Sequence, residues 1–327
     1  MRTIDWVDGA IEIIDQTALP ETLAVRRLAT VAELVAAIQS LAVRGAPALG
    51  VAGALGVALA AREHPPGADR DRAVREIAAA RPTAVNLAAG VRRAAARLPD
   101  GPDAVLAEAL AVRDEEIAAS AAMGARGADL VAGRCGPAAR LLTHCNTGGL
   151  ATVTGGTALA VITELHRRGQ LGGVIASETR PLLQGARLTG WELARAGVPY
   201  RVAVDAAGPF LIARGEVDAV VVGADRICAN RDVVNKIGTY AHALGAARAG
   251  IPFLVVAPES TIDPGTATGA DVPIEDRDPA EVLTYHGRPT APAGAAATNP
   301  AFDITPHDLV TAIVTDRRVI EPGRGGQ

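Results

Sequence analysis

The chain has very few aromatic residues and very few cysteines. Phe, Trp and Tyr together make up 2% of the sequence, although hydrophobic residues make up 49%. The core must therefore be built from Ala, Val and Leu, and wide aromatic platforms for single-stranded nucleic acid are excluded. The cysteines Cys135, Cys145 and Cys228 form neither a CxxC pair nor a zinc-type spacing. This excludes the disulfide framework of a small secreted protein.

The chain also lacks an excess of positive charge and an N-terminal targeting signal. Its formal net charge is -4, which argues against a nucleic-acid partner. No basic start followed by an apolar run precedes residues 4–14, so we see no signal peptide. The uncharged run at residues 45–61 is short for a membrane span and is interrupted by three glycines. We therefore expect a core helix there, in a cytoplasmic protein that contacts no membrane.

The length of 327 residues and the position of its helix-breaking Gly and Pro residues predict two domains. Two alternating runs flank Asp8-Gly9, which is typical of a β-hairpin. A helix with Thr30 as its cap is expected at residues 31–41, and a long connecting helix at residues 102–132. The helix-breaking residues Gly133, Gly136 and Pro137 mark the boundary between the two predicted domains. We expect a hairpin and helical domain over residues 1–135 and a Rossmann-like catalytic domain over residues 136–327.

Beyond the boundary the pattern alternates between strand and helix, which predicts an α/β fold with a parallel sheet. We expect strands at residues 140–143, 173–176, 200–204, 219–222 and 253–257, and helices at residues 157–168, 188–196, 207–213 and 236–249. A P-loop and a dinucleotide GxGxxG motif are both missing from the sequence. Nucleotide cofactors are therefore not indicated.

Four of these strands end in reactive or polar groups: Cys145, Glu178 with Arg180, Asp205, and Asp225. Because parallel strands end at the same edge of a sheet, we expect these groups to converge. A thiol and a carboxylic acid facing each other across a sugar would suit proton transfer between adjacent carbons. Taken alone, Cys145 could instead be a small buried hydrophobic residue. His144 should face away from Cys145 on its strand, which makes it a poor candidate base.

Two helix starts combine an arginine with a proline. In Arg44-Gly45-Ala46-Pro47 the proline suits the first helical position and leaves free amides beside a guanidinium. Such a combination can bind an anion, and phosphate is the usual occupant. Residues 81–86 (Arg-Pro-Thr-Ala-Val-Asn) repeat the pattern. An ordinary loop-to-helix joint with a surface arginine is the alternative for each.

Several blocks resemble the signature of the methylthioribose-1-phosphate isomerase family, and the resemblance covers nearly the whole chain. These blocks are residues 44–47, 81–86, 143–148, 178–189, 223–227, 235–240, 273–277 and 299–303. The family shares its fold with the regulatory subunits of the eukaryotic initiation-factor exchange complex. The resemblance implies an aldose–ketose isomerase of methionine salvage, an amino-acid biosynthetic route. It also implies a homodimer that acts on a sugar phosphate and needs neither metal nor cofactor.

The resemblance assigns site residues by position. It implies that Asp225 is the proton donor and that Cys145 stabilises or relays the transfer. It further implies substrate and phosphate binding by Arg44, Gly45, Ala46, Arg81, Gln184, Asn235 and Lys236.

Some positions depart from the family pattern. Ser177 stands where the family usually has Asp, Ala206 where it usually has Asn, and Arg231 where glycine is common, and Ala88-Ala89 replace an aromatic pair. The group at C5 of the sugar therefore stays open. A 5-deoxy-, 5-halo- or 1,5-bisphosphorylated ribose is an alternative substrate, and a non-catalytic regulatory subunit is an alternative function.

Overall fold

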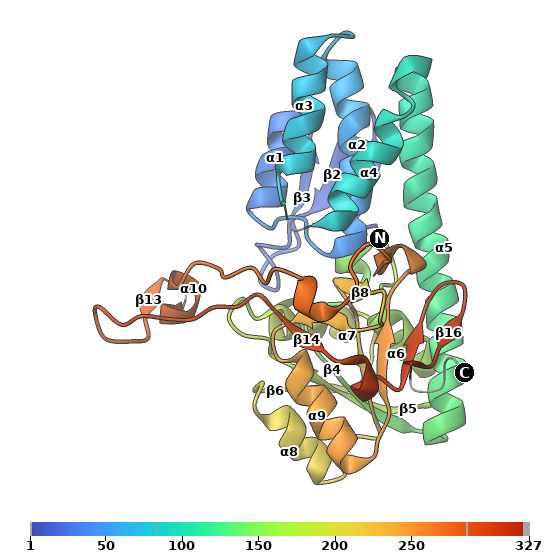
Figure 1. The fold of residues 1–327 in the computed structure, drawn as a ribbon, viewed down its shortest axis with the longest axis vertical. Helices are drawn as coiled ribbons and strands as arrows, with labels where there is room; N and C mark the ends of the chain where they lie inside the picture. The colour runs from blue at the N-terminus through green and yellow to red at the C-terminus, as the bar shows by residue number, and fades with distance from the viewer. Residues whose placement is uncertain (1, 83, 286, 323–327) are drawn as a thin grey trace. The chain divides into compact units, whose positions relative to one another are not determined.

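The computed structural model describes residues 2–82, 84–285 and 287–322 (Figure 1). The chain divides into two compact units. Unit 1 comprises residues 1–124 and 146–160, and unit 2 comprises residues 125–145 and 161–327. The boundary predicted at residue 135 coincides with the end of helix α5, whereas this division falls within that helix. The predicted two-domain partition therefore stays a proposal.

Unit 1 contains a small antiparallel sheet and a group of helices. Its elements are β1 (Ile4–Val7), β2 (Ala10–Ile14), β3 (Val25–Leu28), α1 (Val31–Gln39), α2 (Ala46–Glu63), α3 (Ala68–Ala79), α4 (Val85–Ala95), η1 (Leu98–Asp100), the first part of α5 (Pro102–Cys135), η2 (Gly149–Ala151) and the first residues of α6 (Ala158–Arg167).

The N-terminal hairpin forms where the sequence predicts it. Asp8 and Gly9 both have positive φ, 45° and 82°, which is the geometry of a tight two-residue turn. Strand β3 adds a third, antiparallel strand to β1 and β2. Thr30 caps α1 in a capping box with Glu33, as predicted.

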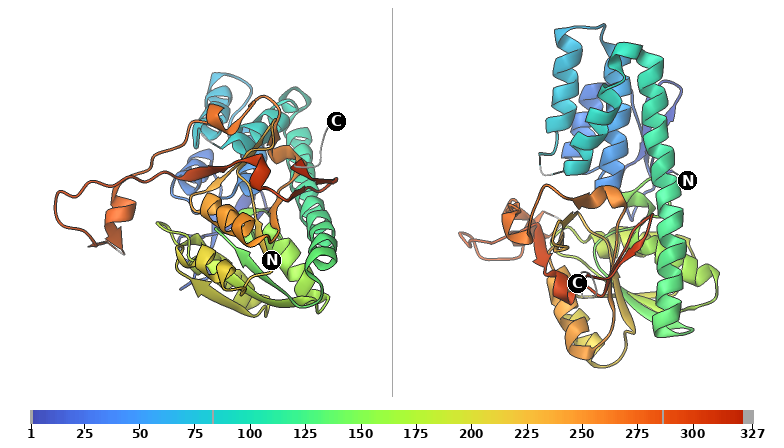
Figure 2. Two further views of the ribbon diagram at one scale, coloured as in Figure 1. Left: turned by 60° about the horizontal axis from the view of Figure 1, so that its bottom comes forward. Right: turned by 45° about the vertical axis from the view of Figure 1, so that its right-hand side comes forward.

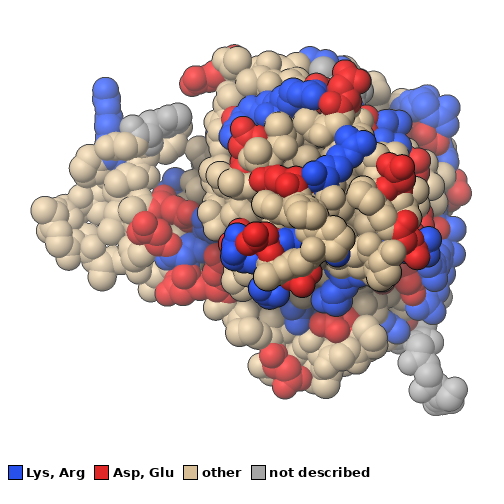
Figure 3. All heavy atoms as spheres, turned by 90° about the horizontal axis from the view of Figure 1, so that it is seen from above, with Lys and Arg blue, Asp and Glu red and all other residues tan. Residues whose placement is uncertain are grey.

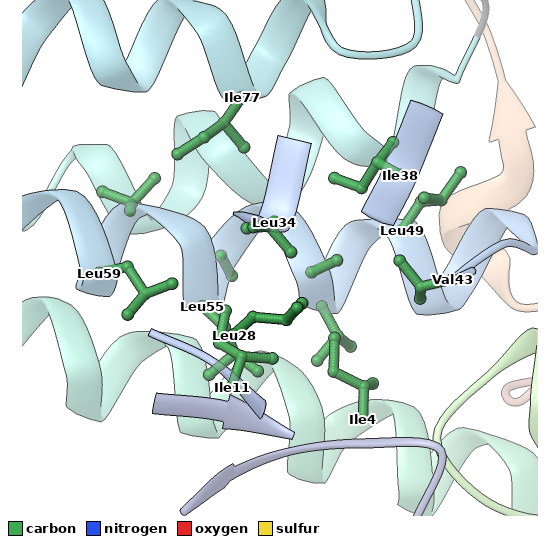
Figure 4. Packing of buried hydrophobic residues seen from close by; sticks show 14 of the residues in the cluster. Ile4, Ile11, Leu28, Leu34, Ile38, Val43, Leu49, Leu55, Leu59 and Ile77 are labelled. Carbon is green, nitrogen blue, oxygen red and sulfur yellow. The ribbon is translucent and has the colours of Figure 1, made fainter. Parts of the chain in front are cut away.

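Helix α2 is the core helix of unit 1. Its apolar side chains pack with those of the sheet and of α1 and α3, as the cluster around Leu34, Leu49, Leu55 and Ile77 shows (Figure 4). By length and composition α2 could cross a membrane, yet 78% of it is buried. The expectation of a core helix at residues 45–61 is confirmed.

Unit 2 contains the larger sheet. Its elements are β4 (Ala139–Thr143), β5 (Leu171–Ser177), η3 (Gly185–Thr189), α7 (Gly190–Arg195), β6 (Tyr200–Ala203), α8 (Ala207–Ala213), β7 (Ala219–Val222), β8 (Arg226–Cys228), β9 (Val233–Lys236), α9 (Thr239–Ala249), β10 (Phe253–Val256), η4 (Glu259–Thr261), β11 (Ile262–Asp263), η5 (Gly269–Asp271), α10 (Ala280–Leu283), β12 (Thr284–Tyr285), β13 (Arg288–Pro289), β14 (Phe302–Thr305), η6 (His307–Leu309), β15 (Ala312–Val314) and β16 (Val319–Ile320), with the remainder of α5 and α6.

The large sheet has the strand order β16-β15-β10-β7-β4-β5-β6. All neighbouring pairs are parallel except β15 with β16. Helices α8 and α9 lie side by side, and α9 packs on β7 and β10 (Figures 1 and 2). The predicted α/β class with a parallel sheet is thus confirmed.

One predicted helix start is wrong. A helix was expected to begin at Lys236, but residues 233–236 form strand β9 of a second sheet with the order β11-β8-β9-β14. The β-branched Val233 and Val234 pair with β14, and Gly238 turns the chain with a φ of 105° before α9 begins at Thr239. Pairing with β14, which lies some seventy residues later in the chain, decides this conformation.

Candidate active site

The C-terminal ends of four parallel strands lie at one edge of the large sheet. Their order is β7, β4, β5, β6, and Leu142 of β4 pairs with Val220 of β7. Cys145 follows β4 and Asp225 follows β7, so the thiol and the carboxylic acid come from neighbouring strand ends. This is the edge at which open α/β sheets hold ligands.

Cys145 is held rigidly by hydrogen bonds to its backbone. It is 7% exposed and has a positive φ of 63°. Its N–H donates to Thr179 Oγ1 over 2.9 Å, and its carbonyl accepts from Thr189 Oγ1 over 2.7 Å. These contacts compensate for a backbone conformation that is rare outside glycine. The segments after β4 and β5 are thereby joined at the thiol.

Asp225 lies beside strand β9. Its N–H donates to the carbonyl of Val234 over 3.0 Å, next to Asn235 and Lys236. Both of those side chains are buried, at 3% and 7% exposed. The Asn235 amide donates to Thr239 Oγ1, so its orientation is fixed. The backbone of Asp225 thus lies beside the end of β9, where Asn235 and Lys236 are located.

The ammonium group of Lys236 lies 5.2 Å from the centre of the Phe302 ring, on the adjacent strand β14. A buried ammonium group over an aromatic face is attracted to the ring electrostatically. This geometry suits a residue that binds phosphate.

His144 joins the Cys145 strand end to the segment after β9. It is fully buried, with Nδ1 2.8 Å from Ser177 Oγ and Nε2 2.7 Å from the carbonyl oxygen of Ile237. Burial lowers the pKa of His144 to about 4 and that of its neighbour His242 to about 3. The prediction that His144 is a poor candidate for a catalytic base stays a prediction.

Asp205 supports the loop after β5. Its carboxylate accepts from Ser177 Oγ over 2.5 Å and from the backbone N–H groups of Thr179 and Arg180 over 2.8 and 2.7 Å. The Arg180 guanidinium donates to the carbonyls of Pro181 and Val282. Of the groups expected at the strand ends, Asp205 and Arg180 are therefore engaged in holding loops.

Gln184 is buried next to the same loop. It is 3% exposed, and its Oε1 atom is buried without a hydrogen-bond partner. It precedes the single π-helical turn η3, a feature that is frequent at functional sites. Gly185 packs directly under β5, since a Cβ atom there would lie 1.7 Å from the Ser177 carbonyl oxygen. A buried acceptor without a partner is suited to a ligand hydroxyl group.

The remaining predicted binding residues, Arg44, Gly45, Ala46 and Arg81, lie in unit 1. Helix α2 begins at Ala46 with Gly45 as its N-cap, and no side chain caps it. Its first N–H groups are therefore left for another partner. Arg44 Nη1 donates to Asn146 Oδ1 over 3.1 Å. Gly45 is required here, because its φ is 92° and a Cβ atom would lie 2.4 Å from the Ala151 carbonyl oxygen.

The helix start predicted at residues 81–86 differs from the prediction. Helix α4 begins at Val85 with Ala84 as its N-cap, so Pro82 precedes the helix instead of opening it. Thr83 lies outside the described residues. Gly50 of α2 packs against Asn86 and Gly90 of α4, which brings the starts of the two helices together.

Sequence reasoning missed Asp303 as a member of this neighbourhood. It pairs with Asn235 across β14 and β9, and its Oδ2 atom accepts from the N–H groups of Gly238 and Tyr240 at the start of α9. Its Oδ1 atom is buried without a partner. Burial raises the pKa of Asp303 to about 6. The sequence block at residues 299–303 was the only available signal.

Within the described part of the chain, no group of three or more His, Cys, Asp or Glu side chains is arranged to hold a metal ion. Figure 3 shows Lys and Arg interspersed with Asp and Glu over one face of the molecule. A mixed surface of this kind is not the basic stripe of a nucleic-acid-binding protein.

The chain belongs to the initiation factor 2 subunit family, whose model matches residues 42–322. It is 54% identical to the methylthioribose-1-phosphate isomerase of Anaeromyxobacter dehalogenans, over 95% of this chain and 90% of the relative. It is 50% identical to the 5-deoxyribose 1-phosphate isomerase of Moorella thermoacetica, over 98% and 94%.

Another relative is longer than this chain. It is a probable bifunctional methylthioribose-1-phosphate isomerase/methylthioribulose-1-phosphate dehydratase of Nocardia farcinica, 52% identical over 99% of this chain. The chain spans only 62% of the length of that relative.

The fold is shared with solved structures. The 5-methylthioribose 1-phosphate isomerase of Pyrococcus horikoshii matches with a TM-score of 0.91 and 40% identity, over 98% of this chain and 92% of that one. Translation initiation factor eIF-2B, subunit delta, from A. fulgidus matches with a TM-score of 0.87 and 43% identity, over 98% and 96%. The predicted resemblance is therefore confirmed.

Proposed function

We propose that this chain isomerises 5-methylthioribose 1-phosphate to 5-methylthioribulose 1-phosphate in methionine salvage. The observation that supports this most is the placement of Cys145 and Asp225 after neighbouring parallel strands, with Asn235 and Lys236 beside Asp225. Relatives about 50% identical carry the name of this activity.

In this proposal Asp225 is the proton donor and Cys145 stabilises or relays the transfer. Arg44, Gly45, Ala46, Arg81, Gln184, Asn235 and Lys236 bind the substrate and its phosphate. The guanidinium groups of Arg44 and Arg81 in unit 1, and the amide and ammonium groups of Asn235 and Lys236 in unit 2, are each of a kind that donates to phosphate. The low exposure of Cys145, Gln184, Asn235 and Lys236 supports a site that excludes water.

The phosphate on the C1 oxygen prevents the sugar ring from opening as a free sugar does. Asp225 protonates the ring oxygen as the bond between that oxygen and C1 breaks. Hydrogen then moves from C2 to C1, and the C2 hydroxyl group returns its proton to Asp225 as the C2 ketone forms. The hydrogen moves either through an enediol-type intermediate relayed by Cys145 or as a direct shift. Atoms balance in both routes, because substrate and product are isomers. Solvent deuterium at C1 of the product would exclude a purely direct shift.

The test replaces Asp225 by Asn. We expect kcat to fall by about 10²–10⁴-fold, since a positioned acid supplies that factor, while the circular dichroism spectrum is retained. The exposed Asp308 supplies the matched control, and Asp308→Asn should turn over like the wild type. Near-wild-type turnover by Asp225→Asn would remove Asp225 from the acid role.

The substituent at C5 has a second candidate. The relative from Moorella thermoacetica is named for 5-deoxyribose 1-phosphate and is nearly as similar as the others. Comparing kcat/KM for the methylthio, deoxy and phospho forms of ribose 1-phosphate decides between them. Failure to isomerise any of these would favour a regulatory subunit.

We further propose that the enzyme is a cytoplasmic homodimer. The edge strand β6 exposes Val202 at 46%, Val204 directly after it is 61% exposed, and Phe210 of α8 is 59% exposed. An unpaired, apolar edge of this kind is usually covered by a partner. Light scattering behind a sizing column should report twice the chain mass of 33.3 kDa, and Phe210→Asp should shift it toward the monomer.

A further inference from the structure

Cys145 lies just beyond the strand that leads to it. Strand β4 ends at Thr143, and its pairing with β5 and β7 reaches no further than that residue. In the division of the chain, Cys145 is the last residue of unit 2 before residues 146–160 of unit 1. Its φ of 63° lies in the left-handed region, which residues other than glycine rarely adopt. Contacts other than strand pairing must therefore hold this backbone.

Two buried threonine hydroxyl groups hold the peptide groups on either side of the Cys145 Cα atom. Thr179 Oγ1, after β5, accepts from the Cys145 N–H over 2.9 Å, and Thr189 Oγ1, in η3, donates to the Cys145 carbonyl oxygen over 2.7 Å. Both threonines are 0% exposed. Because each peptide group is planar, fixing both of them fixes the direction of the Cα–Cβ bond between them. Only rotation about χ1 then remains for the thiol.

The Thr179 hydroxyl group is itself held in place. It donates its proton to the Ser177 carbonyl oxygen over 3.0 Å, so the same oxygen can accept from Cys145. Gly185 leaves room for it, since a Cβ atom there would lie 2.8 Å from Thr179 Oγ1. The Thr179 N–H donates to Asp205 Oδ1 over 2.8 Å. These contacts hold Thr179 at a φ of 66°, which is exceptional for a β-branched residue.

We infer that Thr179 and Thr189 are positioning residues that fix the direction of the Cys145 thiol for the proposed isomerisation. The inference rests on the proposed function, in which Cys145 stabilises or relays the transfer. Residues held in sparsely populated backbone conformations cluster at active sites. Here two such residues, Cys145 and Thr179, are joined by one hydrogen bond. A cysteine that only filled the core would gain nothing from a strained backbone.

Thr179→Val tests the positioning role, because valine is close to threonine in shape and lacks the hydroxyl group. We expect kcat to fall by about 10–100-fold per folded molecule, since a small displacement of a reacting group can cost that much. KM should stay near the wild-type value, because Asn235 and Lys236, which are proposed to bind the substrate, lie on β9. Thr179→Ser keeps the hydroxyl group and should restore most of kcat. Thr261→Val is the control and should match the wild type, since Thr261 Oγ1 in η4 is buried without a hydrogen-bond partner.

Thr189→Val removes the second contact, and Thr189→Ser is its matched rescue. We expect the same loss of kcat at nearly constant KM, restored by serine. A wild-type kcat in both valine variants would refute the positioning role. A serine variant as slow as its valine counterpart would refute it too, because the loss would then not come from the hydroxyl group.

Amide hydrogen exchange tests the Thr179 contact without relying on activity. Protein labelled with ¹⁵N at cysteine alone gives amide signals from Cys135, Cys145 and Cys228, which are assigned by their loss in Cys135→Ser and Cys228→Ala. We expect slow exchange at Cys145 in the wild type and in Thr179→Ser, and faster exchange in Thr179→Val. The Cys228 amide, which donates to the Asp232 carbonyl oxygen over 2.9 Å, is the internal reference.

Fast exchange at Cys145 in the wild type would refute the contact, even if Thr179→Val fails to fold. If the wild type isomerises no pentose 1-phosphate, the proposed function fails, while the exchange result still decides the contact. If the wild type is active and the valine variants keep its kcat, the positioning role fails and the proposed function stands.

Discussion

Asp303→Asn should change how the stability of the protein depends on pH. The Asp303 carboxyl group accepts two N–H groups at the start of α9 through Oδ2, while Oδ1 is buried without a partner. Burial outweighs the two hydrogen bonds and the nearby Lys236, and raises the pKa of Asp303 from 3.8 to about 6. The folded state therefore binds this proton more tightly than the unfolded state does.

The direction of the effect follows from this difference. The stabilising contribution of the proton is fully present below pH 3.8 and is lost as the pH rises through about 6. A shift of about two units corresponds to about 3 kcal/mol over the whole window, and about 2 kcal/mol of it falls between pH 4.5 and 8. Asparagine keeps the shape and one acceptor oxygen but does not titrate.

Urea unfolding of wild type and Asp303→Asn at pH 4.5 and pH 8 measures this effect. We expect the free energy of unfolding of the variant, relative to the wild type, to increase by about 2 kcal/mol between the two pH values. Asp308→Asn, an exposed change nearby in sequence, should show little pH-dependent difference. An equal difference at both pH values would show that Asp303 is not a buried group of raised pKa, and the reasoning would be wrong.

Two further predictions concern glycines. Gly45→Ala should raise the KM for the sugar phosphate and destabilise the protein by about 1–3 kcal/mol, because a residue other than glycine is strained at a φ of 92° and meets the Ala151 backbone. Gly67→Ala is the control, since Gly67 has a φ of 147° but open space around it. An equal KM in both variants would argue against the contact with Ala151. Gly208→Ala should cost about 1–3 kcal/mol through the clash with the His242 ring, measured as a lower thermal midpoint, whereas Gly133→Ala on the exposed side of α5 should stabilise by up to about 1 kcal/mol. A Gly208→Ala protein as stable as Gly133→Ala would contradict the packing of His242.

Local chemistry in the sequence was enough to predict several elements. Asp8-Gly9 specifies a hairpin because both residues tolerate positive φ, and Thr30 begins α1 because its hydroxyl group binds a helix N–H group. The run Ala219–Val222 is a buried strand because it has no polar face. These properties depend only on residues near one another in the chain, so the sequence carries them.

Arg231 departs from the family pattern at a position with an unusual backbone conformation. The resembled family commonly has glycine there, and Arg231 has a φ of 74° in the turn between β8 and β9. The positional preference for glycine thus has a backbone cause. The departure itself marks a strained turn and says nothing about the substrate.

Tertiary structure decided the features that depend on distant partners. Lys236 lies on a strand because β14 pairs with it, and Asp303 became part of the neighbourhood through that same pairing. His144, whose sequence position suggested little, is engaged by Ser177 on one side and by Ile237 on the other. Hydrogen bonds and burial between segments far apart in the chain set these environments, and no local pattern of residues encodes them.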